Sequence, residues 1–292
     1  MGVLEQWENA LLLSAVGAYL VAMLALWGQL FFRADDSSPG AERWHKGAGM
    51  LGRAALAFGA LLHGLALLGQ GGALFGSSAG VAGLFGWILA VVYSLLGMRL
   101  GRDTLGAFVS PLSLLAALYS LTVPPLHRLA RVEALESQWQ IFHVVLIVLG
   151  YVSLALAFAA SLIYLLQEGL LKRKKLSGLW QRLPSLQVAD ELIYRATSFG
   201  LAMLSVGLFI GIVWQQRYHP GYAPLRDPKV LFSLATWITF VLYLAARARL
   251  GWSARRTNLV VVYGFVLLVI SFLGAPHVLH GVTHGVTQGV AR

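Results

Sequence analysis

The chain has 292 residues, of which 58% are apolar and 12% charged, and its mean hydropathy is +0.72. Soluble domains are about 45–50% apolar and about 25% charged. The composition therefore excludes an ordinary soluble globular protein, a disordered chain and a free nucleic-acid binder. The net charge of +10 then indicates Lys and Arg held beside a membrane. Because the chain has no cysteine, it has no disulfide, thiolate metal site or thiol relay of its own.

Eight apolar segments follow one another along the chain. A membrane-spanning helix needs about 20 apolar residues, and lipid forces the backbone polar groups of such a segment to bond within it. The segments do not show the alternation of a membrane β-barrel. We therefore predict an all-α, polytopic integral membrane protein with about eight transmembrane helices, at 11–32, 54–71, 81–98, 105–123, 141–167, 197–214, 230–246 and 259–275.

The loop charges predict the orientation of these spans, because Lys and Arg are enriched in cytoplasmic loops. Sixteen of the 22 Lys and Arg residues fall within 33–53, 99–102, 172–195 and 247–256. The other six fall in the alternate connections and at the C-terminus. We therefore predict a multi-pass protein of the bacterial inner (cytoplasmic) membrane with both termini outside and the 168–196 connection in the cytoplasm.

The predicted organisation is a single transmembrane domain, 1–292, in two parts. Residues 1–134 form an N-terminal four-span part, and residues 135–285 form a second part with an outer aromatic loop at 214–229. That loop carries Trp214, Tyr218 and Tyr222 and ends at Asp227. Such aromatic residues are typical of a membrane-interface belt, and the same surface would suit the faces of a flat apolar cofactor.

The histidines are distributed on one side of the predicted membrane. Imidazole is the commonest metal-binding side chain and also binds haem iron. Six of the eight histidines lie at or beyond the predicted outer face, namely His127, His143, His219, His277, His280 and His284. His45 is predicted to be cytoplasmic. His63 lies within the second span, where it is either bonded to a neighbouring helix or part of a functional site.

The histidines of the tail have a helical spacing. Residues three and four apart are neighbours on a helix, so a helical tail would place His277, His280 and His284 on one face able to bind a metal. Gly281 and Gly285 favour a frayed terminus instead.

Three stretches of the second half occur in a distinctive order. They are ALESQWQIFHVVLIVLGYVSLALAFAASLIYLL, ELIYRATSFGLAMLSVGLFIGIVW and RDPKVLFSLATWITFVLYLAARARLGWSARR. Together they cover about residues 135–275, and they resemble the CcsA/CcmC/HemX family of cytochrome c assembly proteins. The first four spans, including LLHGLALL with His63, are similar to the HemX branch of that family.

The resemblance implies that haem is handled at the outer membrane face, with two histidines binding the iron from either side of a tryptophan-rich loop. His143 matches the first of these histidines by its setting QWQIFH. The second should follow the last span, where His284 fits best and His280 and His277 are alternatives. Trp214 matches the leading tryptophan of the loop, and Asp227 begins its DPK ending.

Elementary haem chemistry suits the same residues. Trp214, Tyr218 and Tyr222 would pack against the ring, and two neutral imidazoles would fill the axial positions. Arg217, Arg226 and Lys229 are placed to meet the propionates through charge-assisted bonds.

The sequence leaves three functions open. The first is a non-enzymatic membrane protein that presents haem b at the outer face for c-type cytochrome biogenesis. Its partners would be the lipid bilayer, a CcsB/ResB-like assembly protein and apocytochrome c, with no nucleic acid. The second is a HemX-like regulatory or scaffolding protein of tetrapyrrole biosynthesis without haem transport. It is suggested by the stretch QQRYHPGYAPLR, which has tyrosines and no tryptophan. The third is a quinone- or lipid-binding membrane protein, for which His63 would supply a polar group.

Overall fold

The computed structural model describes residues 2–31, 39–100, 103–122, 138–174, 183–218, 221 and 223–289. Within these ranges the side chains of 2–5, 39, 41, 72, 73, 97–100, 122 and 274–289 are not described. The long helices are α1 (Gly2–Phe31), α2 (Pro39–Gln70), α3 (Ser78–Leu100), α4 (Asp103–Thr122), α6 (Gln138–Lys172), α8 (Leu186–Tyr218), α9 (Pro228–Ala248) and α10 (Ala254–Gly289). Two short 3-10 turns, η1 (Gly71–Phe75) and η2 (Pro224–Arg226), connect some of them.

The prediction of eight membrane spans is confirmed. In the described part of the chain, 8 helices are long and apolar enough to cross a membrane. Large apolar side chains point away from the protein on most of these helices, as Leu68 (78% exposed) and Phe209 (69% exposed) do. In a protein of this kind such side chains contact lipid, so their exposure costs nothing.

The helices extend beyond the predicted spans. Helix α6 has 35 residues, or about 52 Å at 1.5 Å per residue, against about 30 Å for the hydrocarbon core. Hydropathy marks only the part of a helix that lies in lipid, and the polar turns that continue it do not interrupt the backbone hydrogen bonds. Helix α2 begins at Pro39 and α8 reaches Tyr218 for this reason. The predicted outer loop at 214–229 is therefore shorter, because α8 includes Trp214–Tyr218 and α9 begins at Pro228.

The first bundle contains α1, α2, α3 and α4, with α1 packed against α2 and α3 against α4. Glycines allow the close contact of α1 and α2, since a Cβ atom at Gly59 would lie 2.8 Å from the Tyr19 ring. At one end, Asp103 accepts a hydrogen bond of 2.8 Å from Gln29 Nε2 and also pairs with Arg53. This cluster ties α4 to α1 and α2.

The second bundle contains α6, α8, α9 and α10, and α6 and α8 share its most extensive contact. A Cβ atom at Gly150 or at Gly200 would lie 3.1 Å from the carbonyl oxygen of the other glycine, so the two backbones nearly touch. Helix α10 packs on α9 and α6, where Phe158 and Phe265 stack with ring centroids 4.5 Å apart.

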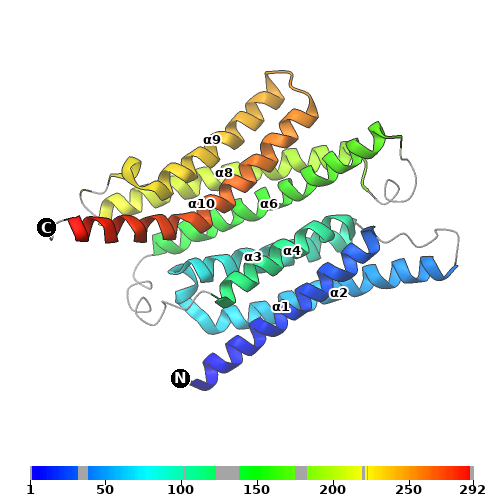
Figure 1. Ribbon diagram of the computed structural model, residues 1–292, viewed down its shortest axis with the longest axis horizontal. Helices are drawn as coiled ribbons and strands as arrows, with labels where there is room; N and C mark the ends of the chain where they lie inside the picture. Colours follow the sequence, from blue (N-terminus) through cyan, green and yellow to red (C-terminus); the bar gives the residue numbers. More distant parts are fainter. Residues whose placement is uncertain are drawn as a thin grey trace.

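Helix α6 joins the two bundles, because it also contacts α3 and α4 (Figure 1). Phe272 of α10 completes the junction by edge contacts with Tyr119 of α4 and Tyr151 of α6, at centroid distances of 6.1 and 6.5 Å. The start of α1 and the end of α10 lie at the same end of the assembly (Figure 1). We call this the terminal end. The side of the membrane that it faces stays a prediction.

Candidate functional site

His143 is the sixth residue of α6 and lies near the terminal end, against the last turns of α8. Its Nδ1 atom is 2.7 Å from the carbonyl oxygen of Gly207. A carbonyl oxygen only accepts hydrogen bonds, so Nδ1 carries the proton and Nε2 keeps the lone pair. A histidine that binds a metal through one ring nitrogen usually donates the N–H of the other nitrogen to a carbonyl or carboxylate oxygen.

The aromatic pair of α8 continues the face that holds His143. Residues 207, 211, 214 and 218 are separated by four, three and four positions, which places them on one side of the helix. The rings of Trp214 and Tyr218 are 5.8 Å apart and tilted by 41°. Trp214 is half-buried and Tyr218 is 52% exposed. The Trp214 and Tyr218 rings therefore lie on the face of α8 that contacts the imidazole, nearer the end of the helix.

The start of α9 lies at the same end of the bundle. Asp227 caps this helix, because its Oδ1 accepts a 2.8 Å hydrogen bond from the backbone N–H of Lys229, with Pro228 in the first turn. Lys229 is exposed and close enough to His143 for the two side chains to interact electrostatically. Arg217 and Arg226 are also exposed. Lys229 thus adds a positive charge near the imidazole, and Arg217 and Arg226 lie on the elements that end or begin at this end of the bundle.

The backbone of α10 is helical through Gly289 and ends at the terminal end. A helical backbone gives His277, His280 and His284 the spacing of one helix face. Their side chains lie outside the described residues, as do Tyr222, His127 and His219. The structure therefore leaves the pairing of a tail histidine with His143 as a prediction. Among the described side chains there is no group of three or more His, Cys, Asp or Glu residues that could hold a metal.

His63 belongs to a different part of the molecule. It is fully buried in the first bundle, where its Nδ1 is 3.2 Å from the hydroxyl oxygen of Tyr19. Its Nε2 has no hydrogen-bond partner in the described part of the chain. That atom would be 3.5 Å from a Cβ atom at Gly83, so the ring packs against the backbone of α3. The structure thus places His63 against α1 and α3, and His143 against α8.

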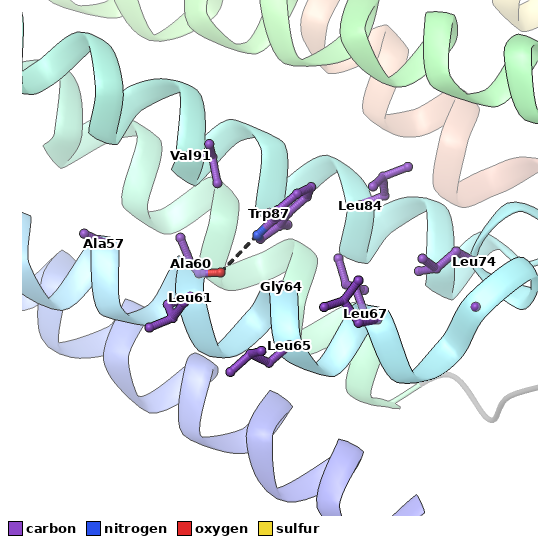
Figure 2. Close-up of a pocket in the computed structure, with 12 residues that line it drawn as sticks. Ala57, Ala60, Leu61, Gly64, Leu65, Leu67, Leu74, Leu84, Trp87 and Val91 are labelled. Atoms are coloured by element: carbon purple, nitrogen blue, oxygen red, sulfur yellow. Dashed lines mark hydrogen bonds between the residues drawn. The ribbon is translucent and has the colours of Figure 1, made fainter. Parts of the chain in front are cut away.

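An apolar groove runs between α2 and α3 (Figure 2). This α2/α3 groove has a volume of about 640 Å³, and its lining includes Leu61, Leu65 and Leu68 of α2 and Leu84 and Trp87 of α3. Figure 2 shows the indole N–H of Trp87 donating to the Ala60 carbonyl, at 3.0 Å. The one polar group of that ring is therefore satisfied, and the groove offers apolar surface.

Two sets of contacts made by α8 were not predicted from the sequence. Gly207 and Gly211 contact His143, although no sequence pattern marks either glycine as part of a site. Asp190 and Arg247 form a pair with two hydrogen bonds of 2.7 Å that ties α8 to α9. Arg247 also lies over the Tyr194 ring, 5.0 Å from its centroid. These partners are 64 and 57 residues apart in the chain, beyond the range of any local pattern.

Comparison with known proteins identifies the relatives of the chain. The family model described as "Cytochrome C assembly protein" matches residues 76–283, which are most of the chain. A cytochrome c biogenesis protein CcsA from Guillardia theta is 30% identical over 208 residues, covering 65% of this chain and 68% of the relative. The CcsA protein from Mesostigma viride is 27% identical over 211 residues, covering 64% and 69%.

A bacterial relative shows the same similarity over a shorter region. The CcsA protein of Synechococcus sp. (strain CC9902) is 30% identical over 164 residues, which cover 49% of this chain and 54% of the relative. The matched region therefore spans between about half and about two thirds of these relatives. No solved structure matches the chain.

Proposed function

This chain belongs to the cytochrome C assembly protein family, and we propose that it serves cytochrome c biogenesis by binding haem at its terminal end. The observation that carries the proposal is the geometry of His143. Its Nδ1–H donates to Gly207, which leaves Nε2 with a lone pair on a half-buried ring. A neutral imidazole held in this tautomer has the donor that haem iron requires.

The surrounding groups fit the rest of a haem. Trp214 and Tyr218 offer ring surface beside the imidazole, and aromatic faces stack on flat apolar groups. Lys229, Arg217 and Arg226 are cationic groups near the terminal end that would pair with propionates. When bound, haem supplies an iron that takes axial ligands and the prosthetic group of a c-type cytochrome. The chain itself would hold and orient that group, without acting as an enzyme.

The second axial ligand in this proposal comes from the end of α10. We assign it to His284, with His280 and His277 as alternatives, because the backbone of α10 is helical through Gly289 and its last turns lie at the terminal end. Tyr222 and Asp227 complete the proposed set, with Asp227 acting through the cap of α9. We assign no haem contact to His63, because its ring packs in the other bundle.

We further propose that the terminal end faces the outside of a bacterial inner membrane. The end of α6 and the start of α8 lie at the opposite end of the assembly, and the KRKK run begins at the last residue of α6. Positive residues of this kind stay in the cytoplasm. The haem would be unmodified haem b, delivered to apocytochrome c with a CcsB/ResB-like partner.

The test of haem binding is the absorption spectrum of the purified protein. The wild type should carry haem with the six-coordinate, low-spin spectrum of two imidazole ligands. His143→Ala should lose that spectrum. His45→Ala changes a histidine in the first turns of α2, away from the terminal end, and should keep it. A folded wild type without haem, or an unchanged spectrum in His143→Ala, would refute the proposal.

The α2/α3 groove favours lipid binding as a second function. Along α2 the groove runs from Ala57 to Leu68, about 16 Å at 1.5 Å per residue. Its lining consists of Ala, Gly, Leu, Val and Trp residues, and this apolar surface suits a hydrocarbon chain from the bilayer.

Native mass spectrometry of the purified protein tests lipid binding. Ala57→Phe would fill the groove, and Ala54→Phe is the control because Ala54 is exposed on the same helix and is not part of the lining. One lipid should remain bound to the wild type and to the control, and be lost from Ala57→Phe. Equal lipid occupancy in the two variants, or a polypeptide in place of the lipid, would exclude this function.

A further inference from the structure

We infer that Gly207 and Gly211 of α8 are positioning residues for His143. Gly211 provides the space that the imidazole occupies, and the Gly207 carbonyl fixes the orientation and tautomer of the ring. The inference rests on the proposed function only where it names haem iron as the group that Nε2 binds.

The space at Gly211 is defined by the ring itself. A Cβ atom at position 211 would lie 2.5 Å from Cε1 and 2.6 Å from Nδ1 of His143, and 3.3 Å from Nε2. Carbon atoms pack at about 3.5–4.0 Å, so any side chain at 211 would collide with the imidazole. The contact is with the body of the ring, which has no flexible end to move aside.

The same missing Cβ exposes the Gly207 carbonyl. In a helix the carbonyl of residue 207 accepts the backbone N–H of residue 211, and each Cβ atom tilts towards the preceding turn. A side chain at 211 would therefore cover the carbonyl of 207. With glycine there, the second lone pair of this oxygen accepts Nδ1–H of His143 at 2.7 Å.

The distance between the two helices makes this bond possible. Gly150 and Gly200 bring the backbones of α6 and α8 into near contact one to two turns deeper in the bundle. A Cβ atom at Gly207 would itself be 2.9 Å from the Ile147 side chain, one turn from His143. Gly150, Gly200 and Gly207 thus keep α8 within hydrogen-bond reach of the His143 imidazole.

The consequence for chemistry lies in Nε2. A histidine whose Nδ1–H donates to a carbonyl presents one fixed tautomer and a more basic Nε2 to a metal. Loss of the hydrogen bond that orients a metal-binding histidine typically lowers metal affinity by about 10- to 100-fold. A residue that acts in this way changes the spectrum and the histidine tautomer, not only the stability of the fold.

The first experiment compares Gly211→Ala with Gly169→Ala in purified protein. Gly169 of α6 has no atom within 4 Å of its would-be Cβ, so its variant controls for alanine in place of glycine. Gly211→Ala should bind haem at least about tenfold more weakly than the wild type, or show a changed low-spin spectrum. Gly169→Ala should match the wild type in both haem affinity and spectrum. A wild-type spectrum and wild-type haem content in Gly211→Ala would overturn the inference.

A second experiment keeps Gly211 and removes the imidazole instead. Added imidazole should restore the low-spin spectrum of His143→Gly. 1-Methylimidazole has no N–H for the Gly207 carbonyl, so restoring the spectrum with it should require an at least about tenfold higher concentration. Free haem provides the reference for the two ligands. Equal rescue of the variant by both compounds would overturn the inference even if Gly211→Ala did not fold.

A readout without haem separates this inference from the proposed function. ¹⁵N NMR of histidine-labelled apoprotein, with His143→Gln to assign the signal, should show the Nδ1–H tautomer in the wild type and its loss in Gly211→Ala. A wild type that holds no haem but shows this tautomer would refute the proposed function alone. A wild type that binds haem without this tautomer would refute the inference alone.

Discussion

The pair of Asp190 and Arg247 should account for a measurable part of the stability of the second bundle. Both hydrogen bonds are 2.7 Å long and form the two-pronged geometry that strengthens carboxylate–guanidinium contacts. Each side chain is 26% exposed. We expect Asp190→Asn to lower the free energy of unfolding because it leaves the Arg247 charge partly buried without its partner.

The magnitude follows from this intermediate exposure. Fully exposed pairs contribute about 0–1 kcal/mol, and breaking a fully buried pair costs about 3–5 kcal/mol. A pair that is about a quarter exposed should lie between these limits, so we expect a loss of about 2 kcal/mol. The neighbouring pair of Glu191 and Arg195 is the matched control, since its side chains are 51% and 77% exposed. Glu191→Gln should cost less than about 0.5 kcal/mol.

A double-mutant cycle with Asp190→Asn and Arg247→Met, measured by unfolding in mixed detergent micelles, isolates the pair. The double variant leaves no unpaired charge. Its loss of unfolding free energy should therefore be about 1–2 kcal/mol smaller than the sum of the two single losses. Single losses that add to within about 0.5 kcal/mol would refute the reasoning.

Three further variants test packing and capping. Gly59→Leu should destabilise the protein by about 1–3 kcal/mol or more, because a side chain there meets the Tyr19 ring. Gly17 has no atom within 4 Å of its would-be Cβ, so Gly17→Leu should cost less than about 1 kcal/mol in the same assay. Phe265→Ala should cost about 3–5 kcal/mol, since the ring is 3% exposed and stacks on Phe158; a cost below about 1 kcal/mol would contradict that packing. Asp227→Ala should cost about 1 kcal/mol by removing the cap of α9. Asp227→Asn keeps a capping oxygen and should retain both the stability and any bound haem. Equal losses of stability in the two variants would exclude the capping role.

The fold was largely predictable because hydropathy reports the cost of placing each segment in lipid. That cost marks the spans and their number, but it does not mark the polar turns that continue a helix into water. The sequence therefore placed Trp214 in a loop, whereas it lies in α8. The even number of spans also required both ends of the chain on one side, and the helices have that arrangement.

The candidate site was predictable only in part. The resemblance to assembly proteins indicated His143, and the structure adds the hydrogen bond that orients it. The contributions of Gly207 and Gly211 could not be foreseen, because a glycine has no chemistry until the helix that lies against it is known. For the same reason the sequence left open whether His63 bonds to a neighbouring helix, which the contact with Tyr19 of α1 answers.

Helix α6 contacts α3 and α4 on one side and α8 and α10 on the other, and it carries His143 near its end. A rotation of α6 about its axis would therefore displace the imidazole relative to α8 and at the same time disturb the junction between the bundles. In the haem site proposed above, such a rotation would change the position of His143 Nε2 relative to α8. Helix α6 is thus the structural link between the packing of the first bundle and the orientation of the imidazole in the second.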